Sequence, residues 1–224
     1  MEFLPDGNMI EFLRNRRKCI SLLSKLYLLY SVSTALRHLD SYKIVHLDIK
    51  PNNVMIAPGL QVKIIDFGEA FHPNVWKDEG KAYRPGFTFP YCPPEFGIGV
   101  KNGCFTSKAD VYSFGVMMFE VIFGRVPFEY RERMFLAPET SDLYGDPIVI
   151  RLLNWMISRC LSRNPDMRPE LDWISVILRQ CLEIVTWIPF PNKSGLQLIL
   201  LLSVFTYFHI LIHTISDYTN KISY

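Results

Sequence analysis

VHLDIKPNNVMI, residues 45–56, places a histidine, an aspartate, a lysine and two asparagines around one proline, next to an apolar run. Two apolar segments, Val54–Ala57 and Val62–Ile65, are separated by Pro58 and Gly59, which predicts two short strands joined in a hairpin. The polar group is therefore predicted to connect a helix to this hairpin. Taken singly, its members are ordinary turn residues, so the case for a functional site depends on the rest of the chain.

Two helices are predicted before the quoted stretch. The chain turns between Pro5 and Gly7, and Asn8 is placed to cap a short helix that follows. From Ser21 to about Leu39, leucine and valine recur at every third or fourth position. That spacing predicts a long helix with one buried stripe.

Three further helices are predicted after the hairpin. Ser107 and Asp110 form an S-x-x-D start to a nearly continuous apolar run that ends at Gly124. Such a run predicts a helix that is buried on most sides. Helical spacing then returns in two segments, at 148–161 and from 170 to about 184.

Composition limits the class of protein. The 224 residues are 49% hydrophobic and 21% charged, which is typical of a globular chain. The net charge of +2 and a single dense basic cluster at 14–18 argue against a nucleic-acid partner. The five cysteines are odd in number and lack a CxxC pair, so we expect neither a disulfide framework nor a zinc site, and a reducing compartment fits. Glu2 and Asp6 interrupt any apolar leader, so secretion is not expected.

Five segments in a fixed order carry a family resemblance. VHLDIKPNN, together with the IDFG whose Asp66 lies thirteen residues after Asn53, resembles the catalytic loop and metal-binding triplet of eukaryotic protein kinases. YCPPEF, SKADVYSFGVMMFE and CLSRNPDMRP resemble later kinase motifs, in the same order. The match extends from about Glu2 to Ile184. It implies a mainly helical fold with a small hairpin, the large (C-terminal) lobe of a protein kinase.

The resemblance implies roles for the polar residues. Phosphoryl transfer requires an aligned acceptor hydroxyl and neutralised phosphate charge. Asp48 would accept the hydroxyl proton and Lys50 would place a positive charge beside the phosphate, and a lysine here resembles kinases directed to serine and threonine. Asn53 and Asp66 would bind Mg²⁺ together with ATP. Met55 would lie beneath the adenine ring.

Other residues are implied as support for the catalytic loop. His46 and Phe67 resemble two members of the stacked apolar column that joins the kinase lobes, and Gly68 completes the metal-binding triplet. Asp110 would anchor the backbone of the catalytic loop from the buried helix.

The activation segment has its own implied contacts. Thr88 resembles the threonine that contacts the catalytic aspartate and lysine. Glu95 and Arg168 resemble the ion pair that braces this segment, and breaking such a buried pair singly costs about 3 to 5 kcal/mol. Glu11 and Glu120 are given no role, and exposure to solvent is the simpler interpretation of both.

The resemblance begins at the kinase hinge. Met1 falls where the small lobe passes into the large one, so Glu2 and Leu4 are expected beside the nucleotide. Neither G-x-G-x-x-G nor V-A-I-K occurs in the 224 residues. The ATP site would lack the elements that cover and hold the phosphates from the small lobe. The chain by itself is therefore expected to transfer no appreciable phosphate.

Leu47 departs from the commonest kinase pattern. Many kinases have an arginine before the catalytic aspartate, and it pairs with a phosphate on the activation segment. Between Glu69 and Phe87 there is also no serine or threonine. The two absences together predict an activity that is not switched by serine or threonine phosphorylation of this loop.

The C-terminal end leaves the kinase pattern. Residues 187–195 are predicted to be a linker, 196–215 an apolar helix and 216–224 a short polar tail. An apolar helix of that length spans about 30 Å, so 196–215 is a candidate membrane anchor. The alternatives are a helix packed on the kinase lobe and a segment that does not fold.

The sequence therefore predicts a partial protein kinase domain at residues 1–186. The expected activity is transfer of the ATP γ-phosphate to serine or threonine of a protein substrate, with Mg²⁺, at the cytoplasmic face and with a candidate anchor at 196–215. The alternatives are a kinase-derived binding module without catalysis and an incomplete gene model.

Overall fold

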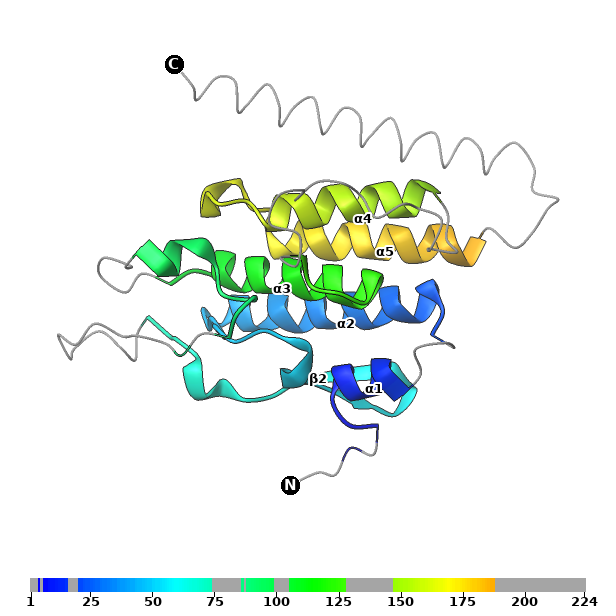
Figure 1. Cartoon of the computed structure of the whole chain (residues 1–224), viewed down its shortest axis with the longest axis horizontal. Helices are drawn as coiled ribbons and strands as arrows, with labels where there is room; N and C mark the ends of the chain where they lie inside the picture. The colour runs from blue at the N-terminus through cyan, green and yellow to red at the C-terminus, as the bar shows by residue number, and fades with distance from the viewer. Residues whose placement is uncertain are drawn as a thin grey trace, which may run out of the picture. The chain divides into compact units, whose positions relative to one another are not determined.

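The computed structural model describes residues 4, 6–15, 20–73, 86, 88–98, 105–127 and 147–187. The chain divides into two compact units, Met1–Thr186 and Trp187–Tyr224. The described helices and the two-stranded sheet belong to the first unit, apart from the last residue of the final helix (Figure 1). This architecture confirms the mainly helical fold with one small hairpin that was predicted for the kinase-like part of the chain.

The predicted apolar helix at 196–215 lies outside the described residues. In the part of the chain that the structure describes, no helix combines the length and the apolar character that crossing a membrane requires.

Helix α1 (Met9–Asn15) begins at the predicted cap. The backbone N–H of Glu11 donates to Oδ1 of Asn8 at 3.0 Å, and the N–H of Asn8 donates back to Oε2 of Glu11 at 3.2 Å. This reciprocal arrangement is a capping box, which satisfies donors that a helix N-terminus leaves open. Glu11 thus has a structural contact that the interpretation as a solvated residue missed.

Helix α2 (Leu22–Ser41) starts after Ser21, whose hydroxyl accepts from the N–H of Ser24 at 3.1 Å. Its buried side differs from the predicted stripe in two ways. Leu28 is buried as well, which widens the buried side, and Leu22 at the start of the helix is only half-buried. The buried apolar residues of this helix are Leu26, Leu28, Leu29, Val32 and Leu36. They form the base on which the neighbouring helices pack.

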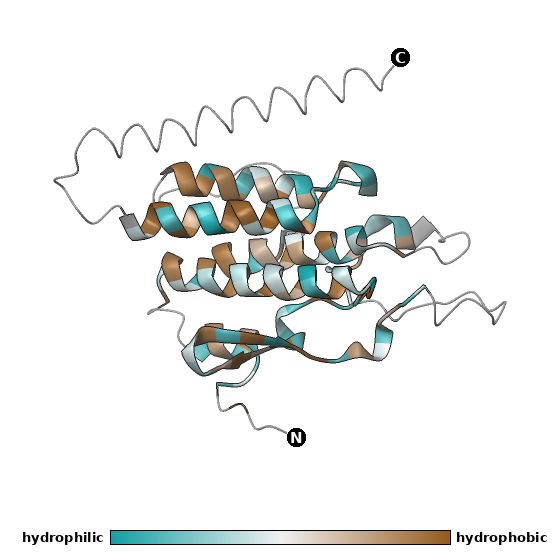
Figure 2. Cartoon of the chain, turned by 180° about the vertical axis from the view of Figure 1, so that it is seen from behind, coloured by the Kyte–Doolittle hydropathy of each residue, from teal (hydrophilic) through white to brown (hydrophobic). Residues whose placement is uncertain are grey.

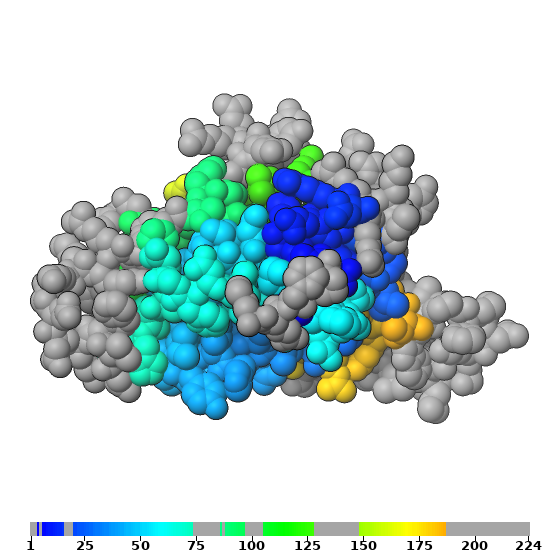
Figure 3. All heavy atoms as spheres, turned by 90° about the horizontal axis from the view of Figure 1, so that it is seen from below, coloured from blue at the N-terminus to red at the C-terminus, as the bar shows by residue number. Residues whose placement is uncertain are grey.

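Strands β1 (Val54–Ala57) and β2 (Gln61–Ile64) form the predicted antiparallel hairpin, with the second strand shifted by one residue from the prediction. The turn between them includes Gly59 at φ +76°, a conformation that glycine adopts without strain. The other edge of β1 receives the N-terminal segment, since the N–H of Ile56 donates to the carbonyl of Gly7 at 3.0 Å. Figure 3 shows α1, in dark blue, beside the cyan residues of the hairpin.

Helix α3 (Ser107–Phe123) is buried along most of its length and ends, as predicted, at Gly124, which has φ +72°. Its start differs from the prediction. Thr106 occupies the N-cap position without a side-chain cap, and the carboxylate of Asp110 bonds to a different segment. The capping box predicted at Ser107 and Asp110 is therefore wrong, because a tertiary contact takes the acidic side chain.

Helices α4 (Pro147–Cys160) and α5 (Leu171–Trp187) complete the helical layer, and Figure 1 shows them side by side. Helix α4 approaches α3 closely, since a Cβ atom added at Gly115 would lie 2.6 Å from Cβ of Cys160. Helix α5 is tied to α2 by a buried hydrogen bond of 2.9 Å from Ser175 to Ser33. Figure 2 shows apolar and polar residues alternating along these helices.

Candidate active site

The loop at 45–53 is fixed from the buried helix α3. The backbone N–H groups of His46 and Leu47 donate to the two carboxylate oxygens of Asp110 at 2.7 and 2.8 Å. Burial raises the pKa of Asp110 to about 7, against the opposing effect of these two hydrogen bonds. Leu47 has φ +65°, so the loop turns sharply at the residue that Asp110 holds.

His46 joins the loop to the segment after the hairpin. Its Nδ1 accepts from the N–H of Asp48 at 3.3 Å, which leaves Nε2 as the protonated nitrogen that faces the carbonyl of Ile65 at 3.0 Å. Burial lowers the pKa of His46, so the neutral ring is favoured. The ring of Phe67 packs against it with the centroids 4.9 Å apart.

Asp48 receives hydrogen bonds from three side chains. Its Oδ2 accepts from Nζ of Lys50 at 2.6 Å and from Nδ2 of Asn53 at 2.8 Å, and its Oδ1 accepts from the hydroxyl of Thr88 at 2.8 Å. The residue is only 8% exposed. A buried carboxylate with three donors is held in one orientation.

Thr88 closes this set of contacts from a distant part of the chain. Its hydroxyl oxygen also accepts from Nζ of Lys50 at 2.8 Å. Asp48, Lys50 and Thr88 therefore contact one another in pairs. The carbonyl of Thr88 accepts from the N–H of Tyr91 at 2.9 Å, which shapes the turn that presents the hydroxyl.

Asn53 and Asp66 are brought together by the backbone. The N–H of Ile65, next to Asp66, donates to the carbonyl of Asn53 at 2.9 Å. The side-chain nitrogen of Asn53 donates to Asp48, at its carbonyl (2.9 Å) and its carboxylate (2.8 Å), so the amide oxygen is the atom left for a cation. Asp66 is exposed, and its Oδ1 accepts a long bond of 3.4 Å from the N–H of Gly68.

These two residues fit a divalent cation that is held mainly by other ligands. Amide and carboxylate oxygens are the donors that Mg²⁺ prefers, and one or two protein ligands suffice when phosphate supplies the rest. Among the described residues, no three His, Cys, Asp or Glu side chains gather as a metal site. The pair thus fits Mg²⁺ that arrives with a nucleotide.

Of the three residues predicted beside a nucleotide, the structure describes Met55 and Leu4. Met55 is half-buried in β1, opposite Lys63 in the hairpin register, and it forms an isolated bridge with Asn8. Leu4 is half-buried, and its carbonyl accepts from Gly7 at 3.2 Å. Glu2 lies outside the described residues.

Arg168 forms an ion pair with Glu95. Its NH1 and NH2 donate to the two carboxylate oxygens at 2.7 and 2.6 Å, a bidentate geometry. The guanidinium also donates to the carbonyls of Ser162 and Lys108 at 2.9 Å each and lies 5.0 Å from the centre of the Tyr112 ring. The charge of this deeply buried guanidinium is matched by Glu95, and the described hydrogen bonds use four of its five N–H donors.

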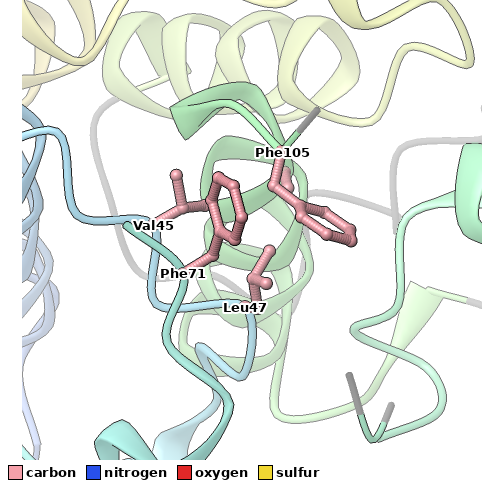
Figure 4. Packing of buried hydrophobic residues seen from close by; sticks show 5 residues of the cluster. Val45, Leu47, Phe71 and Phe105 are labelled. Atoms are coloured by element: carbon pink, nitrogen blue, oxygen red, sulfur yellow. The ribbon is translucent and has the colours of Figure 1, made fainter. Parts of the chain in front are cut away.

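Leu47 lies in an apolar cluster between the loop and its neighbours (Figure 4). Its side chain is 4% exposed and packs with Val45, Phe71 and Phe105, and Ala109 completes the cluster. The rings of Phe71 and Phe105 meet edge to face at 5.2 Å. Hydrophobic burial therefore joins the loop to the following segment at this position.

Two glutamates have contacts that sequence reasoning missed. Glu120 was interpreted as solvated, but the hydroxyl of Tyr91 donates to its carboxylate, and Ser113 donates to the carbonyl of Tyr91 at 2.9 Å. Burial, followed by the bond to Glu120, raises the pKa of Tyr91. Glu69 accepts from the N–H of Gly86 at 2.6 Å. Both contacts span long sequence separations, and no local pattern signals them.

The sequence of the chain also matches a known protein family. A family model described as protein tyrosine and serine/threonine kinase matches residues 1–178. The chain belongs to the protein tyrosine and serine/threonine kinase family. This membership confirms the family that the ordered motifs predicted.

Individual members of the kinase family show the same relationship. The chain is 30% identical over 220 residues to cysteine-rich receptor-like protein kinase 21 of Arabidopsis thaliana, with 87% of this chain and 31% of the relative covered. It is 28% identical over 202 residues to serine/threonine/tyrosine-protein kinase HT1 of the same plant, with 88% and 48% covered. It is 36% identical over 132 residues to megakaryocyte-associated tyrosine-protein kinase of Mus musculus, with 57% and 24% covered.

The chain thus spans less than half of the length of each of these kinases. Their names include both serine/threonine and tyrosine kinases, so family membership leaves the type of acceptor hydroxyl open.

Proposed function

We propose that this chain is the catalytic lobe of a protein kinase that transfers the γ-phosphate of ATP to serine or threonine. The observation that carries the proposal is the set of hydrogen bonds that joins Asp48 to Lys50, Asn53 and Thr88. A structural turn has no need of three convergent donors on one buried carboxylate. A site that must hold a proton acceptor in one place does.

Asp48 is the proposed proton acceptor. Its Oδ2 is engaged by Lys50 and Asn53, whereas its Oδ1 receives a single described bond, from Thr88. A carboxylate oxygen can accept two hydrogen bonds, so Oδ1 has capacity for a substrate hydroxyl. Acceptance of the hydroxyl proton during transfer is worth about 10² to 10⁴ in rate for a positioned base.

Lys50 and Thr88 are proposed to face the substrate. The ammonium group of Lys50 lies between Asp48 and Thr88 and supplies a positive charge on the acceptor side of the site. That charge would oppose the negative charge of the transferring phosphoryl group. A lysine two residues after the catalytic aspartate, held by a threonine, supports serine or threonine as the acceptor.

Asn53 and Asp66 are proposed to bind Mg²⁺, with Met55, Leu4 and Glu2 on the nucleotide side. Bound Mg²⁺ and ATP would supply the phosphoryl group and neutralise part of its charge. Asn53 contributes its amide oxygen because Asp48 engages its amide nitrogen. Asp66 contributes an exposed carboxylate at the start of the Phe67–Glu69 turn.

The binding half of the proposal is testable by nuclear magnetic resonance. The ¹⁵N-labelled 224-residue chain would be titrated with Mg²⁺ and a non-hydrolysable ATP analogue. We expect the amide resonances of Asn53, Met55 and Asp66 to shift, and the response to be lost in Asp66→Asn. A Glu183→Gln variant, changed on the exposed face of α5, is the matched control. Unchanged resonances at saturating analogue would contradict the proposed site.

The transfer half needs a radiolabelled assay with a serine/threonine protein and a poly(Glu,Tyr) polymer as acceptors. Because the 224 residues contain no glycine-rich loop or strand lysine, we expect little transfer by the chain alone. Any polypeptide that includes these 224 residues and transfers phosphate should prefer the serine/threonine acceptor. It should lose this activity in Asp48→Asn. A preference for the tyrosine polymer would contradict the proposed acceptor class. If every polypeptide tested binds nucleotide without transferring phosphate, a binding module is favoured.

Association with a membrane through residues 196–215 and a position at the cytoplasmic face also remain proposals. Extraction of the chain in high-salt buffer without detergent would contradict the membrane anchor.

A further inference from the structure

Glu69 and Gly86 meet although seventeen positions separate them. The backbone N–H of Gly86 donates to Oε2 of Glu69 at 2.6 Å. Hydrogen bonds to a charged acceptor are shorter than those between neutral groups, which agrees with this short contact. Glu69 is the last residue of the Phe67–Glu69 turn and lies three positions after Asp66. The contact therefore starts beside the proposed cation site.

The backbone on both sides of Glu69 is anchored. Before it, the N–H of Ile65 donates to the carbonyl of Asn53 at 2.9 Å. After it, Phe71 and Val45 exchange two backbone hydrogen bonds of 2.7 and 2.9 Å. The carboxylate of Glu69 consequently extends from a segment that is fixed to the catalytic loop at two points.

The partner position is suited to this close approach. A Cβ atom added at Gly86 would lie 3.0 Å from Oε1 of Glu69 and 3.4 Å from its carboxylate carbon. Contacts of 3.0 Å to a Cβ atom are tighter than ordinary packing, so the carboxylate would have to move. A side chain at position 86 would thus disturb the same hydrogen bond that Glu69 makes.

The contact leads directly to the acceptor side of the site. Gly86 precedes Thr88 by two residues, and Thr88 bonds to both Asp48 and Lys50. We propose that Glu69 is a positioning residue that holds the backbone at Gly86 and thereby keeps Thr88 against Asp48 and Lys50. The segment with the proposed cation ligand and the segment that faces the substrate are then joined by one carboxylate. The consequence for transfer rests on the proposed function, whereas the positioning of Thr88 does not.

Amide hydrogen exchange in the 224-residue chain tests the positioning. The reporters are the N–H of Gly86 and the N–H of Tyr91, which donates to the carbonyl of Thr88. In Glu69→Ala we expect protection to fall about tenfold at Gly86 and about threefold or more at Tyr91. Glu69→Gln keeps an acceptor oxygen and should lose less. Glu183→Gln, an exposed change on α5, should leave both amides as in the wild type.

A double-mutant cycle distinguishes positioning from a merely structural effect. Gly86→Ala should lower protection of the Tyr91 amide in the wild-type background, because the added methyl group displaces the carboxylate of Glu69. In the Glu69→Ala background the same change should have no further effect, since nothing remains to displace. Equal effects in the two backgrounds, or an unchanged Tyr91 amide in Glu69→Ala, would overturn the proposal.

The nucleotide titration separates this inference from the proposed function. If Asn53 and Asp66 do not respond to Mg²⁺ and the ATP analogue in the wild type, the proposed function fails, and the exchange results still decide the role of Glu69. If they respond, the wild-type resonance of Thr88 should shift with them and should cease to do so in Glu69→Ala. A Thr88 shift that survives in this variant would show that Glu69 does not join the two segments.

Discussion

The hydroxyl of Thr88 lies 2.8 Å from Oδ1 of Asp48, although forty positions separate the two residues. The same hydroxyl accepts from Lys50, so a residue of the activation segment completes the group around the proposed proton acceptor. The geometry of this group depends on how the segment that contains Thr88 packs onto the loop at 45–53. Replacement of Thr88 therefore measures how much these hydrogen bonds contribute to the free energy of unfolding.

Replacement of Thr88 by valine keeps the shape of the side chain and removes its hydroxyl. Both Asp48 and Lys50 lose a partner, so we expect the free energy of unfolding to fall by about 1 to 2 kcal/mol. Thr88→Ser retains the hydroxyl and should stay close to the wild type. Urea unfolding followed by circular dichroism measures both. Equal stability of Thr88→Val and Thr88→Ser would show that these hydrogen bonds contribute nothing to folding.

Removal of the Glu95 carboxylate should be the more damaging change. Glu95→Ala leaves the guanidinium of Arg168 buried without its counter-charge, and we expect a loss of about 3 kcal/mol in the free energy of unfolding. Asp172→Ala, which removes the exposed partner of Arg37, is the matched control and should cost less than about 1 kcal/mol. The two unfolding midpoints in urea compare them directly. Similar midpoints would mean that the Glu95 pair behaves as a surface pair.

The stability of the chain should depend on pH through Asp110. Burial raises the pKa of Asp110 from 3.8 to about 7, so between pH 4 and 7 the folded state retains a proton that the unfolded chain releases. Over this range, rising pH lowers the free energy of unfolding. Asp110→Asn cannot titrate. The wild type should therefore lose stability relative to this variant as the pH rises from 5 to 8.

Urea unfolding of both proteins at pH 5, 6, 7 and 8 measures that difference. The lowered pKa of His46 also contributes to the pH dependence, but this residue is present in both proteins, so its direct contribution cancels in the comparison. A wild type that gains stability relative to Asp110→Asn over this range would show that the hydrogen bonds from His46 and Leu47 outweigh burial.

Leu47→Ala tests the apolar cluster. Truncation of a buried leucine removes its packing against Phe71 and Phe105, and we expect a loss of about 2 to 5 kcal/mol in the free energy of unfolding. Leu23→Ala, at a position that is 37% exposed on α2, should cost far less. Thermal or urea unfolding of the two variants gives the comparison. A small effect at position 47 would mean that the cluster does not hold the loop.

The predictable part of the structure came from local patterns. The long helix after Ser21, the cap at Asn8, the hairpin and the helix end at Gly124 depend on spacing and backbone preferences of neighbouring residues. The order of short motifs predicted the kinase family. Strand and helix limits differed by one to three residues because ends are set partly by packing.

The missed contact of Glu11 is local, whereas those of Glu120 and Glu69 join segments that are distant in sequence. For Asp110 the local spacing predicted a capping role, whereas its bonds to the backbone of residues 46 and 47 were expected only from the family resemblance. Glu120 and Glu69 resemble solvated acids until the activation segment brings Tyr91 and Gly86 to them. Nothing local distinguishes an acidic side chain with a tertiary partner from one that faces water.

Asp110 grips main-chain atoms of residues 46 and 47, so this attachment is indifferent to the side chain at position 47. The backbone conformation restricts the choice of residue at position 47 more strongly, because φ there is +65°. Glycine and asparagine tolerate that conformation, whereas valine and isoleucine strain it. In a library of all replacements at position 47, tolerated residues should be those that fill the apolar space and accept a left-handed backbone. The bonds to Asp110 should persist in every replacement except proline, which lacks the N–H.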